Sequence, residues 1–145
     1  IRATAMIIQS AVTEHGAAVD FAGHIGGDDF AIITDTGRYE MICTDIIRRF
    51  DENIDYFYNE TDRSRRYIVA KNRQGREMTF PLMSVSIAVV TREPDRQMNH
   101  LEIGEIAAEL KEYAKSIPGS VYVANRREKE CVEHPAESPG LTLVH

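Results

Sequence analysis

The sequence predicts one domain of the α+β class, in which helices pack on a mostly antiparallel central sheet. Stretches with apolar residues at helical spacing alternate with short β-branched runs, in the order helix, hairpin, helix, strand, helix, strand. The chain has 145 residues, of which 43% are hydrophobic and 28% are charged, so it can bury one core. No apolar run reaches the roughly 18 residues that a membrane span needs, and no signal pattern opens the chain, so we expect a cytoplasmic protein.

The first element expected is a helix over residues 3–15, because alanine, isoleucine and valine recur there at helical spacing before a glycine ends it. Strands are expected over 19–25 and 30–34, separated by a bend of two glycines and two aspartates. These segments predict a β-hairpin whose tip carries Asp28 and Asp29.

A long amphipathic helix is expected from Tyr39 to about Asn59, since apolar residues fall on one face throughout that stretch. Residues 59–66 are polar and charged, and no regular element is expected there. Two short β runs, 67–70 and 77–80, flank a polar turn and predict a second, exposed hairpin.

The remaining elements expected are a central strand over 82–90, a helix over 103–114 and a short strand over 121–123. Residues 126–145 are charged and contain proline without any periodic pattern, so we expect a mobile tail there. The folded domain is therefore expected to cover residues 1–125.

The overall charge argues against binding to polyanions, and the cysteines argue against a cysteine-based metal site. A net charge of −6 disfavours non-specific binding to nucleic acid or to an anionic membrane. Cys43 and Cys131 lack the spacing of metal ligands and are expected to be free thiols. The second hairpin carries a group of basic residues that could face a partner domain, although a solvated hairpin is the simpler account: Arg63, Arg65, Arg66, Lys71, Arg73 and Arg76.

The bend Gly26–Gly27–Asp28–Asp29 offers the residue types that a polyphosphate and a divalent cation need. Glycine leaves main-chain N–H groups open to phosphate, and Mg²⁺ prefers carboxylate oxygens together with phosphate and water. The same residues also make a good hairpin turn with no ligand at all, and the local pattern does not separate these two interpretations. His24, beside the bend, is expected to be a packed or surface histidine rather than a ligand.

Three landmarks in order make the segment from residue 1 to about 123 resemble the GGDEF domain of diguanylate cyclases. Residues 26–30 resemble the signature, residues 84–88 resemble the core strand that follows, and Ala114–Lys115 resembles the end of the last helix. The resemblance implies a fold like the palm of nucleotide cyclases and polymerases. Its first strand and leading helix would precede residue 1, and the second hairpin would be an addition to it.

The resemblance also implies a reaction in which two GTP molecules condense to cyclic di-GMP and two pyrophosphates, with Mg²⁺ or Mn²⁺, when two such domains face each other. Asp28 would hold the metal and act with Asp29 as a catalytic carboxylate. Gly26 and Gly27 would let the nucleotide lie against the turn, and Lys115 would reach its terminal phosphates. An upstream sensor or receiver domain would control the pairing, with no nucleic acid or membrane as partner.

The sequence departs from the family pattern at several positions. Asp29 stands where the family has glutamate, and it reaches about 1.5 Å less far. Asp20 matches the aspartate of the family's inhibitory Arg-x-x-Asp pattern, but Ala17 replaces the arginine, so we expect no high-affinity inhibitory site. The arginine after the last helix is also replaced, around Ser120. The family's other metal-binding aspartate and its guanine-reading Asn/Asp pair are not in this chain, so we expect it to be inactive alone.

Two other interpretations stay open. The domain could be a degenerate, non-catalytic module that binds GTP or a partner protein, and Mg²⁺-dependent GTP binding without turnover would indicate it. The chain could instead be an unrelated α+β protein whose hairpin carries these residues by chance. A sheet in which the Gly26 turn does not border the strand over 82–90 would indicate that. Lys115 is favoured near a helix C-terminus by the helix dipole in any case.

Overall fold

The computed structural model describes residues 1–92 and 97–125, so Cys131 and the expected tail at 126–145 lie outside the described residues. The expected mixture of helices and strands is confirmed. The elements in chain order are α1 (Arg2–His15), β1 (Phe21–Gly26), β2 (Asp29–Ile33), α2 (Tyr39–Ile54), the short 3₁₀ helix η1 (Asp55–Phe57), α3 (Glu60–Arg65), β3 (Tyr67–Lys71), β4 (Glu77–Pro81), β5 (Ser86–Val89), α4 (His100–Ser116) and β6 (Val121–Ala124).

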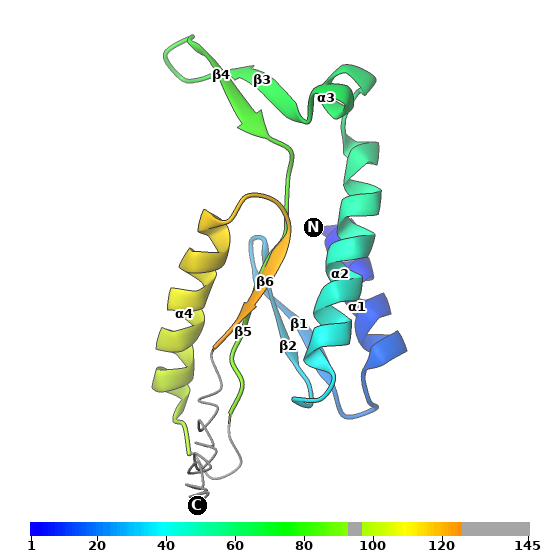
Figure 1. Ribbon diagram of the computed structural model, residues 1–145, viewed down its shortest axis with the longest axis vertical. Helices are drawn as coiled ribbons and strands as arrows, with labels where there is room; N and C mark the ends of the chain where they lie inside the picture. The colour runs from blue at the N-terminus through cyan, green and yellow to red at the C-terminus, as the bar shows by residue number, and fades with distance from the viewer. Residues whose placement is uncertain (93–96, 126–145) are drawn as a thin grey trace, which may run out of the picture.

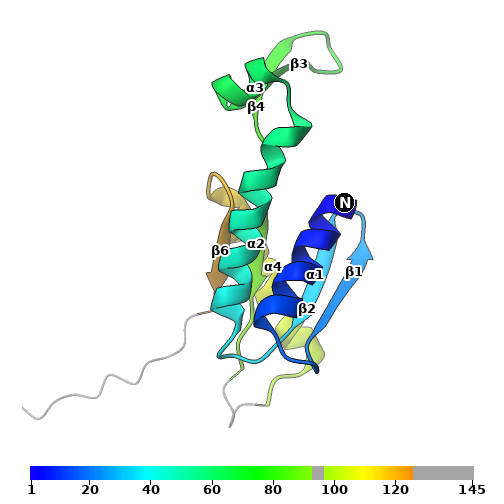
Figure 2. The same cartoon turned by 90° about the vertical axis from the view of Figure 1, so that its right-hand side faces the viewer.

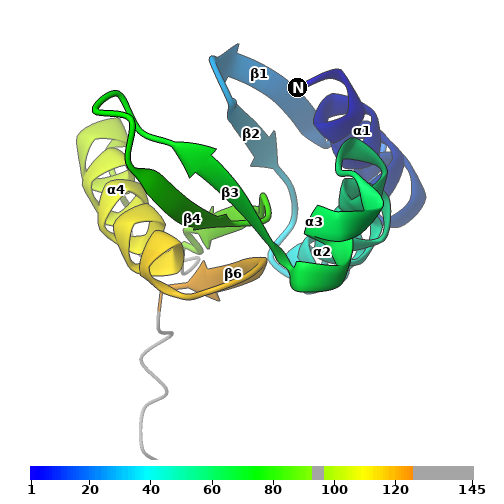
Figure 3. The ribbon, with the colours of Figure 1, turned by 90° about the horizontal axis from the view of Figure 1, so that it is seen from above.

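Within residues 1–92 and 97–125 the strands form three two-stranded sheets rather than the one central sheet that was expected. In the body of the molecule they lie between α4 on one side and the α1–α2 pair on the other (Figures 1 and 3). The pairs β1–β2 and β3–β4 are antiparallel, as expected for hairpins, whereas β5 and β6 are parallel. Parallel pairing follows from the connection, because α4 carries the chain back from the end of β5 to the start of β6. Within the described residues no hydrogen-bonded ladder joins β2 to β5.

One hydrophobic core unites two of these sheets. Its buried centre comes from the facing sides of α1 and α2, which lie side by side in Figure 2, and consists of Ile8, Ala11, Val12, Ile42 and Ile46. Phe30 and Ile32 of β2 pack against this centre, and so do Val85 and Ile87 at β5. The hairpin and the β5–β6 sheet therefore share one apolar interior although their backbones are not paired.

Two expected elements differ in length from those observed. The helix that begins at Tyr39 ends at Ile54, five residues early, and continues only as the 3₁₀ turn η1. The strand expected over 82–90 is limited to Ser86–Val89, because the N–H of Val85 donates to Ser120 Oγ at 3.1 Å instead of to a strand partner. The free thiol of Cys43 is buried in α2, and this burial raises its pKa to about 11, so the thiol is inert.

The second hairpin is confirmed and projects from the body together with α3 (Figure 1). We call residues 60–81 the arm. Its strand residues are all exposed except Ile68, which is half-buried. At the base of the arm, the N–H of Met83 donates to the Tyr58 hydroxyl at 2.9 Å, and Arg66 lies 3.3 Å from Asp55. The arm thus stands on a narrow base.

Candidate functional site

The tip of the β1–β2 hairpin is built by backbone conformations that suit glycine. Gly27 has a φ of +59°, in the left-handed region that other residues adopt only at a cost of about 1 kcal/mol or more. The space around Gly27 is open, so the preference for glycine comes from the backbone conformation and not from crowding. The Nε2–H of His24 donates to the Gly27 carbonyl at 3.0 Å, and its ring packs on Phe30 with the centroids 4.8 Å apart. His24 is therefore an exposed histidine whose ring contacts Phe30 and whose hydrogen bond fixes the bend.

The two aspartates at the tip have different surroundings. Both are exposed, so the bend is open to solvent and is not packed inside the molecule. The Asp28 side chain has no hydrogen-bond or ion-pair partner within the described part of the chain. Asp29, in contrast, accepts a hydrogen bond from Lys111 Nζ at 2.6 Å. This bond and the charge of Lys111 lower the pKa of Asp29, with a further small contribution from the charge of Lys115.

Helix α4 brings both lysines to the hairpin. Lys111 and Lys115 are one helical turn apart, so they lie on neighbouring positions of the same face. Lys115, the residue expected to reach a phosphate, acts on Asp29 through its charge, whereas Lys111 makes the direct contact. Sequence reasoning missed Lys111, although its spacing of four residues from Lys115 was a usable signal.

Asp20, expected as the remnant of an inhibitory site, has a local structural role. Its carboxylate accepts hydrogen bonds from the N–H of Ala17 at 2.9 Å and from the Thr34 hydroxyl at 2.7 Å. These bonds, with the charge of Arg38, lower the pKa of Asp20. The carboxylate thus ties the loop after α1 to the end of β2, and a guanidinium acts on it from a position other than residue 17.

The described residues contain one group of three acidic or histidine side chains close enough to share a metal ion, and it lies on α1 and α2. Its members are Glu14, His15 and Asp45, whose ligand atoms lie within 4.8 Å of one another. The group is already neutralised by guanidinium groups. Arg49 pairs with both Glu14 and Asp45, and Arg48 pairs with Asp45.

These contacts hold the pKa of the buried Asp45 carboxyl at about 2, with Arg49 as the largest cause and Arg48 next among the stabilising contacts. His15 Nε2 lies 3.1 Å from the same carboxylate. The group is therefore an ion-pair network that joins α1 to α2, and it offers a metal ion no free ligand pair.

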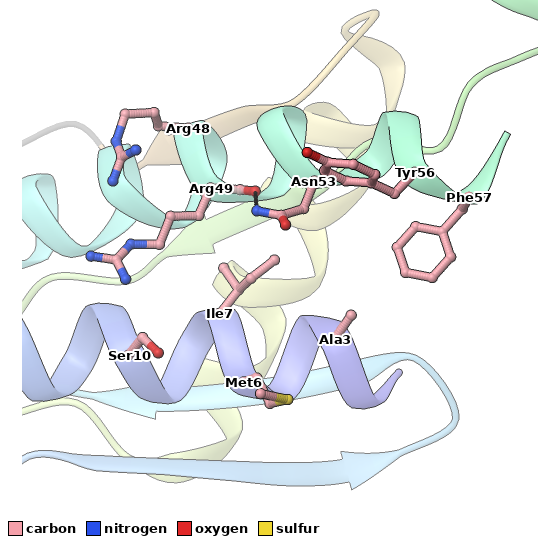
Figure 4. Close-up of a pocket in the computed structure, with 9 residues that line it drawn as sticks. All are labelled: Ala3, Met6, Ile7, Ser10, Arg48, Arg49, Asn53, Tyr56 and Phe57. Atoms are coloured by element: carbon pink, nitrogen blue, oxygen red, sulfur yellow. Dashed lines mark hydrogen bonds between the residues drawn. The ribbon is translucent and has the colours of Figure 1, made fainter. Parts of the chain in front are cut away.

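Two surface hollows lie away from the hairpin tip. The larger, about 690 Å³, runs between α1 and the end of α2, where Met6, Tyr56 and Phe57 give it an apolar lining beside the Arg49 side chain (Figure 4). The smaller, about 470 Å³, lies beside Asp45 and Tyr122. Neither of these two hollows includes residues 26–29, which are exposed at the tip of the hairpin.

The tip fits a hard cation only in part. Mg²⁺ is commonly held by one or two carboxylates together with substrate phosphates and water. Asp28 offers one free carboxylate in an exposed position, and Asp29 offers a second only if Lys111 releases it. Gly26, Gly27, Asp28 and Asp29 are thus brought together by the hairpin, Lys111 and Lys115 join them from α4, and Asp20 serves the loop after α1.

Within the described residues, no helix is both long enough and apolar enough to cross a membrane. Comparison of the chain with protein-family models, with curated proteins and with solved structures finds no match.

Proposed function

We propose that this chain is the output domain of a bacterial-type signalling protein and that, with the residues that would precede it, the domain condenses two GTP molecules to cyclic di-GMP and two pyrophosphates. The observation that carries the proposal is the solvent-exposed glycine bend, where the free carboxylate of Asp28 lies beside an Asp29–Lys111 pair. An acid that can hold a cation and lysines that can face phosphates are the parts that phosphoryl transfer uses most.

In the proposed reaction each 3′-hydroxyl attacks the α-phosphate of the other nucleotide, and pyrophosphate leaves. Mg²⁺, when bound, neutralises phosphate charge and lowers the pKa of the attacking hydroxyl. Asp28 would hold the cation, the open main chain at Gly27 would let the phosphates approach, and Lys115 would contact the terminal phosphates. Two domains are needed because each presents one nucleotide, and an upstream sensor or receiver domain would bring them together.

The test compares this chain with a version extended upstream, each incubated with GTP and Mg²⁺ while cyclic di-GMP is measured by mass spectrometry. We expect product only from the extended protein, and we expect Asp28→Ala to reduce its formation by about a hundredfold or more. Asp35→Asn is the matched control, because it removes an exposed charge at the other end of β2 and keeps the acceptor for the Gly37 N–H. Product formation that survives Asp28→Ala would contradict the role of that residue.

A second candidate is a degenerate module of the same family that binds GTP or a partner protein without turnover. The observation in its favour is that the Asp29 carboxylate is already paired with Lys111, so only the Asp28 carboxylate is free at the tip. Mg²⁺-dependent binding of GTP to the extended protein, measured by calorimetry and unaccompanied by product, would support this candidate over the enzyme.

A third candidate is an α+β protein unrelated to the cyclases. It is favoured by the absence of a ladder between β2 and β5 within the described residues, since the hairpin then does not border β5 directly. The extended protein separates this candidate from the other two, because Mg²⁺-dependent binding or turnover of GTP is expected from a member of the cyclase family and not from an unrelated α+β protein.

A further inference from the structure

The arm presents an apolar face on which three of four side chains are exposed and one, Ile68, is half-buried. The strand register pairs Ile68 with Phe80 and Ala70 with Met78, so these four side chains share one face of the hairpin. Met78 is 45% exposed and Phe80 is 40% exposed. Because a two-stranded hairpin is marginally stable on its own, an uncovered apolar face of this kind favours a partner.

The arm is also basic in an acidic protein. Residues 60–81 contain six arginines or lysines and three aspartates or glutamates, a net charge of +3. The net charge of the whole chain is −6, so all other residues together carry −9. Five exposed side chains of the arm form no hydrogen bond or ion pair within residues 1–92 and 97–125: Arg63, Arg65, Lys71, Arg73 and Arg76.

These charges select among the surfaces that could cover the arm. Two arms packed face to face would bring +3 against +3, which is unfavourable. A nucleic acid would meet the arm favourably, but the charge of −9 on the remaining residues would repel it, and the apolar face would stay uncovered. The surface that fits best is therefore an acidic protein surface with apolar residues on it.

Helix α4 offers such a surface. Glu105, Glu109 and Glu112 are exposed, and their spacing of four and three residues places them on one side of the helix. None of the three has a hydrogen-bond or ion-pair partner in the described part of the chain. Leu101, one turn before Glu105, is 67% exposed and lies on the same side.

We propose that the arm of one copy of this protein docks on the outer face of α4 of a second copy. The face made by Ile68, Ala70, Met78 and Phe80 would cover Leu101, and the unpaired arginines at the turn of the arm, Arg73 and Arg76, would meet the glutamates. The same contact made in both directions closes a two-fold pair, which limits the assembly to a dimer. This proposal rests on the arm and α4 alone and does not require the proposed enzymatic activity.

The experiment measures self-association by sedimentation of the full chain over a range of concentrations and salt. We expect a dimer that weakens as salt rises, since unpaired surface charges provide part of the attraction. Arg73→Glu with Arg76→Glu, or Glu105→Lys with Glu109→Lys, should each weaken the dimer by about tenfold or more. The matched control is Arg2→Glu with Arg92→Glu, which makes the same change in charge outside the arm and should leave the dimer intact.

A mixture of the two reversed variants gives the decisive result. Each variant alone places like charges against each other, but in a mixed pair both contacts again join opposite charges, so the dimer should return. Return of the dimer also demonstrates that both variants are folded. Met78→Ser should weaken the dimer without removing its dependence on salt.

Three results would overturn the proposal. One is a monomeric wild-type protein at all concentrations. Another is a dimer that neither reversal affects, or that the mixture does not restore although circular dichroism shows both variants folded. The third is binding of a labelled single-stranded oligonucleotide that is lost in the Arg73→Glu, Arg76→Glu variant, because the arm would then be a polyanion-binding surface.

Discussion

Two adjacent aspartates at the hairpin tip differ in what they can do because of one lysine. Lys111 Nζ donates a hydrogen bond to the Asp29 carboxylate at 2.6 Å, whereas the Asp28 carboxylate has no partner among the described residues. A free, exposed carboxylate can accept a cation without first breaking an ion pair, and a paired one cannot. If the tip binds a cation, we therefore expect Asp28 to be the better ligand of the two.

The pairing of Asp29 predicts a pH effect. Because the pKa of Asp29 in the folded protein is below its usual value, the Asp29–Lys111 pair stabilises the fold above that usual value, and the contribution is lost as the pH falls through the lowered pKa. Lys111→Met should return the pKa of Asp29 toward its ordinary range, measured from the carboxyl carbon shift by NMR. Lys115→Met is the control and should raise it less, since Lys115 acts only through its charge. An equal rise in both variants would contradict the assigned contact.

The glycines and aspartates of the candidate site were predictable from the sequence. Of its two lysines, Lys115 was predicted and Lys111 was not. Gly26, Gly27, Asp28 and Asp29 are consecutive, so a local pattern identifies them. Lys111 lies 82 residues after Asp29, and its contact depends on how α4 packs beside the hairpin, which no local pattern contains.

At the scale of elements, α1 and α2 are joined by apolar packing and by the buried charge of Asp45. The carboxylate of Asp45 is paired with Arg48 and Arg49, while its neighbour Ile46 is fully buried in the core. Removal of a buried charge from such a network leaves its partners without compensation, which costs more than the loss of an exposed pair.

We therefore expect Asp45→Asn to lower the free energy of unfolding at neutral pH by about 2 kcal/mol. Since the pKa of Asp45 is about 2 in the folded protein and about 3.9 in an unfolded chain, its contribution is present above about pH 4 and lost as the pH falls toward 2. Urea unfolding at pH 7 and at pH 3 measures both effects. Glu52→Gln, which removes an exposed partner of Arg48, is the control and should change stability by about 0.5 kcal/mol or less. Equal effects of the two substitutions would contradict a buried role for Asp45.

The elements were predictable where apolar residues recur at helical spacing over many residues, as in α1. They were also predictable where a polar turn separates two β-type runs, as in the arm. Helix α3 was missed because its residues are polar all round, although Asn59 was a readable start signal: its side-chain oxygen accepts the Asp62 N–H at 2.8 Å. The pairing of β5 with β6 could not be read locally, because register between distant strands is decided by packing.

At the scale of the whole molecule, two sheets share one core while their neighbouring strands stay unpaired. Phe30 and Ile32 of β2 and Ile87 of β5 pack on the same buried centre. Within the described residues β2 is hydrogen-bonded only to β1, and β5 only to β6, so each has one edge without a ladder. Open strand edges are templates for a further strand.

If the chain is the GGDEF-like domain proposed above, a first strand precedes residue 1, and we predict that it pairs with the open edges of β2 and β5. In a protein extended upstream, the amides of β2 and β5 that face these edges should exchange with deuterium at least about tenfold more slowly than in this chain, because each would gain a backbone hydrogen bond. The β3–β4 amides of the arm are the internal control and should exchange at the same rate in both proteins, since the arm is remote from these edges (Figure 1). Unchanged exchange at β2 and β5 in an extended protein that is folded would contradict the palm-like fold and favour an unrelated α+β protein.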